Sequence, residues 1–337
     1  MRVVTDIALG AHLRGSTHPE SPDRVERVAS MLREQPGITV VEEDVEADVA
    51  TLRLVHPQRY IDLVARECEE AEGFRDLSTG DVLVDANSFS VARRAAGSAL
   101  RACEWTQGDG APSFALVRPP GHHAEPARGM GFCIFNNVGV VARSIHARTG
   151  ARVAILDIDY HHGNGTQALV GEGISYISSH AWPAYPGTGG PGEQARTASG
   201  DVLINLPIDP RGISTEGFVA LWERVAAFVE RNVRPEAIVV SAGFDYVRGD
   251  PVGDLGVERS AAGGLARIFA GLAGRLGAPL LYVLEGGYDV ENVTASILEI
   301  AAVHDLGTAD ASGAAAGAIP ASLQRILDRV EGDLSGA

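Results

Sequence analysis

Acidic and imidazole side chains follow a short apolar run within Val153–Gln167, near the middle of the sequence. The branched residues of Val153–Ile158 are typical of a strand buried on both faces of a parallel sheet. Because side chains alternate along a strand, we expect Asp157, Asp159 and His161 on one face where it ends. This group would make a poor core and a good metal site, since open α/β sheets bind ligands at that edge. Aspartate and histidine suit Zn²⁺ or Fe²⁺, whereas a calcium site would need more oxygen ligands.

Three other predicted strands are also followed by chemically active residues. The tandem His122 and His123 lie in the loop RPPGHH, Asp245 follows the apolar run that ends in SAGFD, and Tyr288 lies in LEGGYD. The carboxyl ends of parallel strands share one edge of the sheet, so these residues are expected to meet the first group there.

The combined residues can perform metal-assisted hydrolysis. A metal held by Asp159, His161 and Asp245 keeps positions open for water and substrate. It would polarise a carbonyl group and lower the pKa of a bound water. The adjacent His122 and His123 can take a proton from that water and return it to a leaving amine.

The remaining roles fall to residues of the same loops. Each tandem histidine needs a partner that orients it, and Asp157 and Asn164 are available. The phenol of Tyr288 can donate a hydrogen bond to the oxyanion of a tetrahedral intermediate. Cys133 lies in the apolar run GFCIF and is interpreted as a packing residue, so no covalent nucleophile is predicted. The predicted reaction is therefore hydrolysis of an amide.

Other polar residues receive structural interpretations. His162 points away from His161 along the strand, and Asp250 in RGDP is read as a turn residue. Four histidines without convergent partners are expected to be surface or packing residues: His12, His56, His146 and His304.

Short apolar runs alternate with helical patterns along the chain, which predicts one α/β domain with a mostly parallel sheet and helices on both faces. The predicted strands are Arg2–Thr5, Thr39–Glu42, Ser113–Val117, Val153–Ile158, Ser175–Ser178, Val202–Leu206, Ala237–Ser241 and Pro279–Leu284. The predicted helices are Pro22–Arg33, Pro57–Ala71, Ser88–Thr106, Asn136–Arg148, Thr215–Asn232, Glu258–Arg275 and Val290–Val303. The Gly/Ala-rich piece Gly307–Gly317 is read as a flexible connection to a last short helix, Pro320–Glu331. Residues 1–337 are therefore taken as a single domain.

Composition favours a cytoplasmic protein. The 337 residues are 45% hydrophobic and 21% charged, with no apolar run long enough to span a membrane and no pattern of a signal peptide. Three cysteines without metal-ligand spacing suggest a reducing compartment. The net charge of −16 argues against binding to nucleic acid or an anionic membrane surface.

Four blocks of the sequence resemble the successive signature blocks of the histone deacetylase family: RPPGHHAEPARGMGFCIFNN, LDIDYHHGNGTQ, SAGFDYVRGDP and LEGGYD. The resemblance includes prokaryotic members and acetylpolyamine amidohydrolases, and extends from about His18 to about His304. Asn164 stands where enzymes of the first class usually have aspartate, so the chain is more similar to class II enzymes and their bacterial relatives.

The resemblance implies an arginase-like α/β fold with a central sheet of eight mostly parallel strands. It implies a zinc ion at the same three residues proposed above, and acid–base and electrostatic roles for His122 and His123. Asp157 matches the residue that orients His122, and Asn164 matches the partner of His123, making that imidazole less basic than an aspartate would. Tyr288 matches the tyrosine that stabilises the transition state.

The resemblance also implies a structural potassium ion near the zinc. Its matching ligands are the Asp157 side chain, the Ser178 hydroxyl, and the backbone carbonyls of Asp159, His161 and Ser179. Further matches concern the substrate. The acyl-lysine tunnel would have Phe132 and Tyr185 as walls, with Gly131 supplying a carbonyl, Gly287 lining it and Val252 at its rim. Arg24 matches an arginine of the internal channel through which acetate is thought to leave.

The substrate stays open at this point. Val252 cannot hold a distal ammonium as glutamate does in polyamine-selective vertebrate relatives, although Asp81 or Asp254 would be a replacement. The rim segments 74–87 and 181–198 depart most from the family. Candidates are an acylated lysine peptide, an acetylpolyamine and a small acylated amine, with acetyl as the expected acyl group. A dimanganese ureohydrolase would need more metal ligands, and intact His122, His123 and Tyr288 speak against a non-catalytic acyl-ligand binder. The oligomeric state, including a homo-oligomer, is left open.

Overall fold

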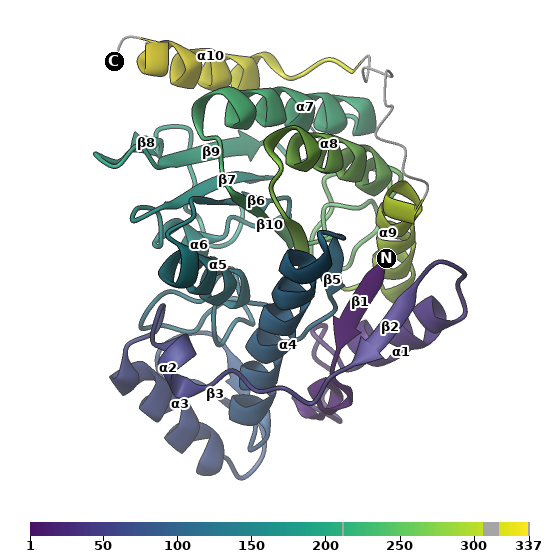
Figure 1. Ribbon diagram of the computed structural model, residues 1–337. Helices are drawn as coiled ribbons and strands as arrows, with labels where there is room; N and C mark the ends of the chain where they lie inside the picture. Colours follow the sequence, from purple (N-terminus) through teal and green to yellow (C-terminus); the bar gives the residue numbers. More distant parts are fainter. Residues whose placement is uncertain (211, 306–316, 336–337) are drawn as a thin grey trace.

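One large sheet organises the molecule, whose computed structural model describes residues 1–210, 212–305 and 317–335. The sheet has nine strands in the order β2-β1-β5-β11-β10-β6-β7-β9-β8, all parallel except for the antiparallel pair β8–β9. Figure 1 shows α7, α8 and α9 on one side of the sheet and α4 and α5 on the other. The expected α/β fold is confirmed.

The bounds of the elements are as follows. The strands are β1 (Arg2–Thr5), β2 (Thr39–Glu42), β3 (Arg75–Asp76), β4 (Leu83–Val84), β5 (Ser113–Ala115), β6 (Val153–Asp157), β7 (Ile174–Ala181), β8 (Ala195–Arg196), β9 (Val202–Ile208), β10 (Ala237–Ala242) and β11 (Leu280–Leu284). The helices are η1 (Ile7–Ala11, a 3-10 helix), α1 (Asp23–Arg33), α2 (Val49–Leu52), α3 (Gln58–Glu69), α4 (Ser88–Asp109), α5 (Asn137–Thr149), α6 (Asn164–Gln167), α7 (Thr215–Asn232), α8 (Ala261–Leu276), α9 (Val290–Asp305) and α10 (Ala321–Ser335).

The eight predicted strands are all present, with ends shifted by a few residues. The ninth, β8, forms because the rim segment folds back and pairs Ala195 with Leu203 and Arg196 with Val202. It is too short to leave a pattern in the sequence, as are the β3–β4 hairpin, η1, α2 and α6. The Gly/Ala-rich piece Gly307–Gly317 lies, except for its last residue, outside the described residues.

The central strands explain why the site lies at the carboxyl edge. Every residue of β6, β7, β10 and β11 is buried, so these strands cannot leave polar side chains on their faces without partners. Their polar residues gather where the strands end and loops begin. Helix α5 starts in the same region, where the Asn136 side chain accepts a hydrogen bond from the Gly139 amide at 2.8 Å.

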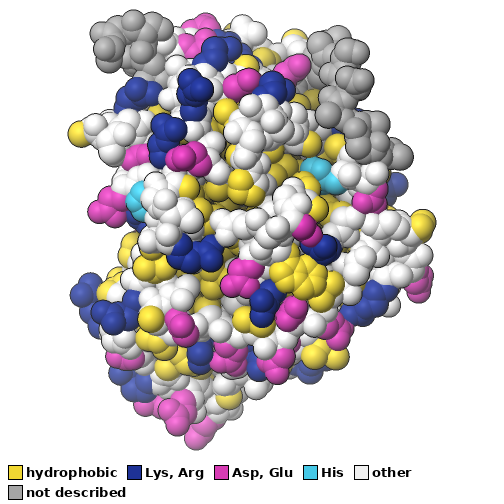
Figure 2. All heavy atoms as spheres, in the orientation of Figure 1, with side chains coloured by type: hydrophobic (Ala, Val, Ile, Leu, Met, Phe, Trp, Pro, Cys, Tyr) yellow, Lys and Arg dark blue, Asp and Glu magenta, His cyan; other side chains and the backbone are white. Residues whose placement is uncertain are grey.

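The opposite edge of the sheet has a different character. A hollow of about 750 Å³ opens there between the C-terminal ends of α4, α5 and α8, lined by residues such as Ala273, Pro279 and Leu280. Figure 2 shows apolar side chains gathered near the centre of this face. Among the residues that the structure describes, no helix is both long enough and apolar enough to cross a bilayer.

Candidate active site

Three buried residues converge at the carboxyl ends of β6 and β10. Asp159 and His161 follow β6, Asp245 follows β10, and their ligand atoms all lie within 4.8 Å of one another. Nδ1 of His161 is 2.9 Å from Oδ2 of Asp245 and 3.3 Å from Oδ1 of Asp159. One nitrogen and two carboxylate oxygens therefore face a common position, as the sequence predicted for a metal site.

Backbone amides hold the two carboxylates in place. The amide of Gly286 donates to Oδ2 of Asp159 at 2.7 Å, and the amide of Tyr160 donates to Oδ1 of Asp245 at 2.9 Å. A Cβ atom at Gly286 would lie 2.3 Å from Oδ2 of Asp245, and one at Gly243 would lie 1.8 Å from Oδ2 of Asp159. Only glycine fits at these two positions, so the surrounding backbone is shaped around the carboxylates.

The charges fit a bound cation. Burial and the neighbouring Asp159 carboxylate raise the pKa of Asp245 to about 7. Burial opposes a charge on His161 as well, but the two aspartates outweigh it and raise the pKa of His161 to about 9. Two carboxylates buried side by side thus attract positive charge strongly. Together with the Asp/His donor set, this suits a divalent metal such as zinc or iron.

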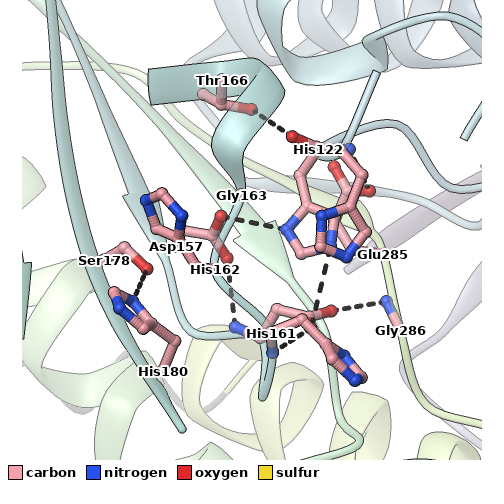
Figure 3. A network of polar contacts seen from close by, with 12 residues as sticks. His122, Asp157, His161, His162, Gly163, Thr166, Ser178, His180, Glu285 and Gly286 are labelled. Carbon is pink, nitrogen blue, oxygen red and sulfur yellow. Dashed lines mark hydrogen bonds and ion pairs between the residues drawn. The ribbon is translucent and has the colours of Figure 1, made fainter. Parts of the chain in front are cut away.

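His122 is arranged to stay protonated. Its Nδ1 lies 3.2 Å from Oδ2 of Asp157, and its Nε2 lies 3.8 Å from Oδ1 of Asp159. Burial would lower the pKa of His122, but these carboxylates outweigh that effect and raise it to about 10. Figure 3 shows His122 pointing toward Asp157, with the Thr166 hydroxyl bonded to its backbone carbonyl.

His123 is arranged to stay neutral. Burial and the nearby His122 and His161 hold its pKa well below 6.5. Its Nδ1 lies 2.9 Å from Oδ1 of Asn164, whose amide nitrogen donates to Oε1 of Glu125 at 2.8 Å. Since the amide oxygen can only accept, Nδ1 of His123 carries the proton and Nε2 keeps its lone pair. The two adjacent histidines therefore differ in protonation because their partners differ.

Tyr288 lies at the same edge, in the loop that follows β11. Its ring centroid is 5.7 Å from that of Phe132 and 4.7 Å from Cζ of Arg24. Burial together with the Asp245 and Asp159 carboxylates raises the pKa of Tyr288 well above 10, despite the opposing charge of Arg24. The phenol therefore keeps its proton and is available as a hydrogen-bond donor.

The residues expected at a potassium ion also lie together. Asp157 and Ser178 are paired across β6 and β7, and both are buried. Nε2 of His180 lies 2.9 Å from the carbonyl oxygen of Gly189 and must donate to it, so Nδ1 accepts from the Ser178 hydroxyl at 2.8 Å (Figure 3). The Ser178 hydroxyl therefore donates its hydrogen bond to His180, and its oxygen can coordinate a cation. The Ser179 hydroxyl accepts a hydrogen bond from the Trp222 indole at 3.0 Å.

Two of the predicted tunnel residues lie against His123, and a third, Phe132, lies against Tyr288. The ring of Tyr185 lies 5.1 Å from the ring of His123, and a Cβ atom at Gly131 would lie 2.3 Å from the His123 ring and 2.9 Å from Tyr185. Phe132 has a φ of 69°, a left-handed conformation that is uncommon for a bulky residue. Asp81 closes this group, because it accepts hydrogen bonds from the Tyr185 hydroxyl at 3.0 Å and from the Gly131 amide at 3.1 Å.

The other residues predicted to contact the substrate or the leaving acetate are Gly287, Arg24 and Val252, and their contacts are with other parts of the protein. Gly287 has a φ of 107°, and its carbonyl accepts from Nε of Arg24 at 2.6 Å. Arg24 is fully buried, and it also donates to Glu20 at 3.1 Å and to the carbonyl of Glu285. Val252 is half-buried and is held through its backbone amide, which donates to Asp250 at 2.9 Å.

Two carboxylates at this edge make contacts that the sequence did not predict. Oε2 of Glu285 accepts hydrogen bonds from the amides of Gly121 at 2.6 Å and His122 at 3.0 Å, while its Oε1 has no hydrogen-bond partner among the residues that the structure describes. Asp250, interpreted as a turn residue, does bind the amides of its own turn but also reaches the Tyr288 loop. A glutamate directly after a buried strand was the available signal for Glu285.

The histidines set aside in the sequence have structural contacts. His12 is buried against Ser88 and Glu20 and so does have partners, contrary to the expectation. His56 bonds to the carbonyl of Pro126, His146 to that of Ala151, and His304 to the Tyr282 hydroxyl. His162 lies between Thr188 and Gln167, with distances of 2.7 and 2.8 Å. Cys133 is fully buried, and burial raises the pKa of its thiol well above 9.

Comparison with known proteins gives the family. A family model described as the histone deacetylase domain matches residues 18–304. The chain is 35% identical to an uncharacterized protein of Synechocystis sp. (86% of this chain, 94% of the relative) and 34% identical to a probable deacetylase of Archaeoglobus fulgidus (83% and 79%). It is 33% identical to Histone deacetylase 15 of Arabidopsis thaliana, with 84% of this chain and 52% of that protein covered.

A solved structure supports the same conclusion. The crystal structure of the HDA15 HD domain superimposes with a TM-score of 0.84 at 29% identity, covering 99% of this chain and 95% of that chain. The predicted arginase/deacetylase-like fold is thus confirmed. The chain belongs to the histone deacetylase family of hydrolases.

Proposed function

We propose that the protein is a zinc-dependent deacetylase that hydrolyses N-acyl amides, acetyl foremost, of lysine side chains or related amines. The observation that carries this proposal is the pairing of a three-residue metal group with a histidine whose Nε2 lone pair is free. Nδ1 of His123 is bonded to Asn164, and its ring lies 5.8 Å from that of His161. A base beside a metal site is what activation of water requires.

The residues Asp159, His161 and Asp245 would hold the metal. Zn²⁺, or Fe²⁺ in its place, would supply Lewis-acid chemistry, polarising the amide carbonyl and acidifying a water molecule. His123 then takes the proton from the attacking water on Nε2 and delivers it to the nitrogen of the leaving amine. Its low pKa keeps it in the basic form at neutral pH, as this role demands.

The neighbouring groups stabilise developing negative charge. The phenol of Tyr288 donates a hydrogen bond to the carbonyl oxygen as it becomes an oxyanion. His122 stays protonated between Asp157 and Asp159 and adds a fixed positive charge beside the reacting atoms. A structural K⁺ would be held by Asp157, Ser178 and neighbouring backbone carbonyls. This proposal is supported by the buried pairing of Asp157 with Ser178, whose hydroxyl donates its hydrogen bond to His180 and can coordinate a cation through its oxygen.

A second candidate substrate class is favoured by one observation. Asp81 lies beside Tyr185 and Gly131, where a tunnel formed by these residues would open. An exposed carboxylate there would attract a distal ammonium group, so an acetylpolyamine or another small acylated amine is the alternative. Val252 offers no such charge.

The test is an assay of the purified protein against a fluorogenic acetyl-lysine peptide and N-acetylated polyamines in parallel, each with and without a hydroxamate. Metal content is measured on the same sample. Hydroxamate-sensitive peptide turnover with about one zinc or iron per chain is the expected result. Turnover of polyamines alone would favour the second candidate. Tight binding of the acylated ligands without turnover would contradict both.

A further inference from the structure

The carboxylate of Asp250 is nearly buried and accepts hydrogen bonds from four backbone amides. Oδ1 binds the amides of Val252 at 2.9 Å and Gly253 at 3.1 Å, which belong to its own turn. Oδ2 binds the amides of Tyr288 at 2.6 Å and Asp289 at 3.2 Å. Each oxygen therefore serves a different loop.

In the proposed reaction, the Tyr288 phenol and the metal that Asp245 would hold both act on the carbonyl oxygen of the substrate. The two loops bound by Asp250 carry these two residues. The loop after β10 contains Asp245 as well as Asp250, and the loop after β11 contains Tyr288. Oδ2 of Asp250 thus ties the backbone of the tyrosine to the loop that supplies a metal ligand. Bonds from amides to a charged oxygen are shorter and stronger than bonds between neutral groups, as the 2.6 Å distance to Tyr288 illustrates.

The ring of Tyr288 is confined independently of its backbone. Arg24 lies over one side of the ring, with Cζ 4.7 Å from its centroid, and Phe132 contacts it edge-on at 5.7 Å. Arg24 also holds the preceding carbonyl, that of Gly287, at 2.6 Å. Arg24 fixes the ring and the Gly287 carbonyl on one side. The hydrogen bond from the Tyr288 N–H to Oδ2 of Asp250 then fixes the position of the Tyr288 backbone nitrogen.

We propose that Asp250 is a positioning residue for the reaction, which places the Tyr288 phenol relative to Asp245 by binding the Tyr288 amide. The inference rests on the function proposed above, because it assumes that the phenol acts on a substrate oxygen. Asparagine cannot replace Asp250, because each carboxylate oxygen accepts hydrogen bonds from two backbone amides. In asparagine an NH₂ group, which only donates, would stand in place of one of these oxygens. Either the turn or the Tyr288 loop would lose its bonds.

Asp250→Asn, Tyr288→Phe and the double variant provide the test, with Asp201→Asn as a matched control. Asp201 is also a buried, amide-binding carboxylate, but it bonds to Gly173 near the start of β7, at the other edge of the sheet. The measurements are kcat and KM on the acetyl-lysine peptide, metal content and Tm. Should Asp250→Asn not fold, Asp250→Glu takes its place.

We expect Asp250→Asn to lower kcat by about 30-fold to 100-fold, with KM and metal content within about threefold of the parent. In the Tyr288→Phe background the same change should cost less than about threefold, because the group it positions is gone. Full additivity of the two changes, or a kcat loss no larger than that of Asp201→Asn at equal Tm, would overturn the assignment.

A crystal structure of Asp250→Asn separates this inference from the proposed function, since it needs no turnover. The Tyr288 hydroxyl should move by about 1 Å or more relative to Asp245, or occupy two positions. An unmoved phenol would overturn the positioning role even in an active enzyme. An inactive parent protein with a displaced phenol would instead contradict only the proposed reaction.

Discussion

The floor of the candidate site and its rim are built in different ways. On the floor, Asp157, Asp159 and Asp245 are fully buried, and each accepts a hydrogen bond from at least one backbone amide. On the rim, Trp182 and Tyr185 are 36% and 39% exposed, in a segment rich in glycine and proline. The floor is therefore held by the sheet itself. The rim segment is tied down at Gly189 and at β8, where Ala195 and Arg196 pair with β9, but Trp182 and Tyr185 stand partly exposed beyond these ties.

Hydrogen bonds connect the rim segment 181–198 to other parts of the chain. Tyr185 is bonded to Asp81 of the segment 74–87, and the carbonyl of Pro191 accepts from Arg329 of α10 at 2.8 Å. Exposed loop residues such as Trp182 and Tyr185 can change with little cost to the fold, because they lie outside the buried core. We infer a division of labour in which the proposed chemistry depends on the strand ends and the proposed substrate choice depends on the exposed rim. The following predictions test that division.

Removing a floor ligand should have the largest effect. His161→Ala leaves two carboxylates without their imidazole, so we expect loss of the bound metal and of measurable turnover. Metal content by mass spectrometry and activity on the acetyl-lysine peptide check this together. A variant that keeps its metal and a tenth of its activity would show that the ligand set is wrong.

The next largest effect should come from Tyr288→Phe. Loss of one donor to a developing oxyanion typically lowers kcat by about 10²-fold to 10³-fold. Metal content and Tm should be close to those of the parent, because the phenol lies at the site and ties no element of the sheet. Near-normal kcat would remove Tyr288 from the reaction.

A change of protonation on the floor should move the pH profile. His123 acts in its neutral form, and its pKa lies below 6.5, so kcat/KM should fall only as the pH drops below that value. Asn164→Asp places a carboxylate on the proton of Nδ1, which raises the pKa of His123. The acid limb should then shift to higher pH by about one unit or more.

This variant needs a companion change. A new carboxylate at position 164 would face Glu125, which now accepts from the Asn164 amide at 2.8 Å. It is therefore made together with Glu125→Gln, and Glu125→Gln alone serves as the control. An acid limb that stays in place in the double variant would argue that His123 is not the base.

The smallest effects should come from the rim. Tyr185→Phe removes the hydroxyl that binds Asp81 and keeps the ring against His123. We expect kcat to hold and KM to change by only about twofold to fivefold, since one partly exposed hydrogen bond contributes about 1 kcal/mol. Asp81→Asn should change the ratio of kcat/KM for cationic and neutral acylamines in the same assay. A large loss of kcat in either variant would contradict the division of floor from rim.

The sequence predicted the floor well because its signals are local. Buried strands leave continuous apolar runs, and Asp159, His161 and Asp245 stand within a few residues of the ends of such runs. The eight long strands and the main helices follow from the same patterns. The short β8 could not be predicted, since pairing of two residues with β9 depends on how the rim segment folds back.

The ties between loops could not be predicted either. Glu285 binds an amide 164 residues away, and Asp250 binds one 38 residues away. Neither separation follows the repeat of a helix or a strand. A backbone amide can also come from any residue except proline, so the partner of such a carboxylate leaves no signal in the sequence. The placement of Asp81 beside Tyr185 depends in the same way on two exposed segments that meet only in the folded chain.

The backbone amides bound by Glu285, Asp250 and Asp159 have a consequence for hydrogen exchange. The amides of Gly121, His122, Gly286 and Tyr288 all donate to carboxylate oxygens, although they lie in loops. Loop amides usually exchange with solvent through small local openings. These amides should instead exchange as slowly as those of the central strands and as one group, because freeing any of them exposes a buried carboxylate. The loops at the site would then form a single cooperative unit with the sheet.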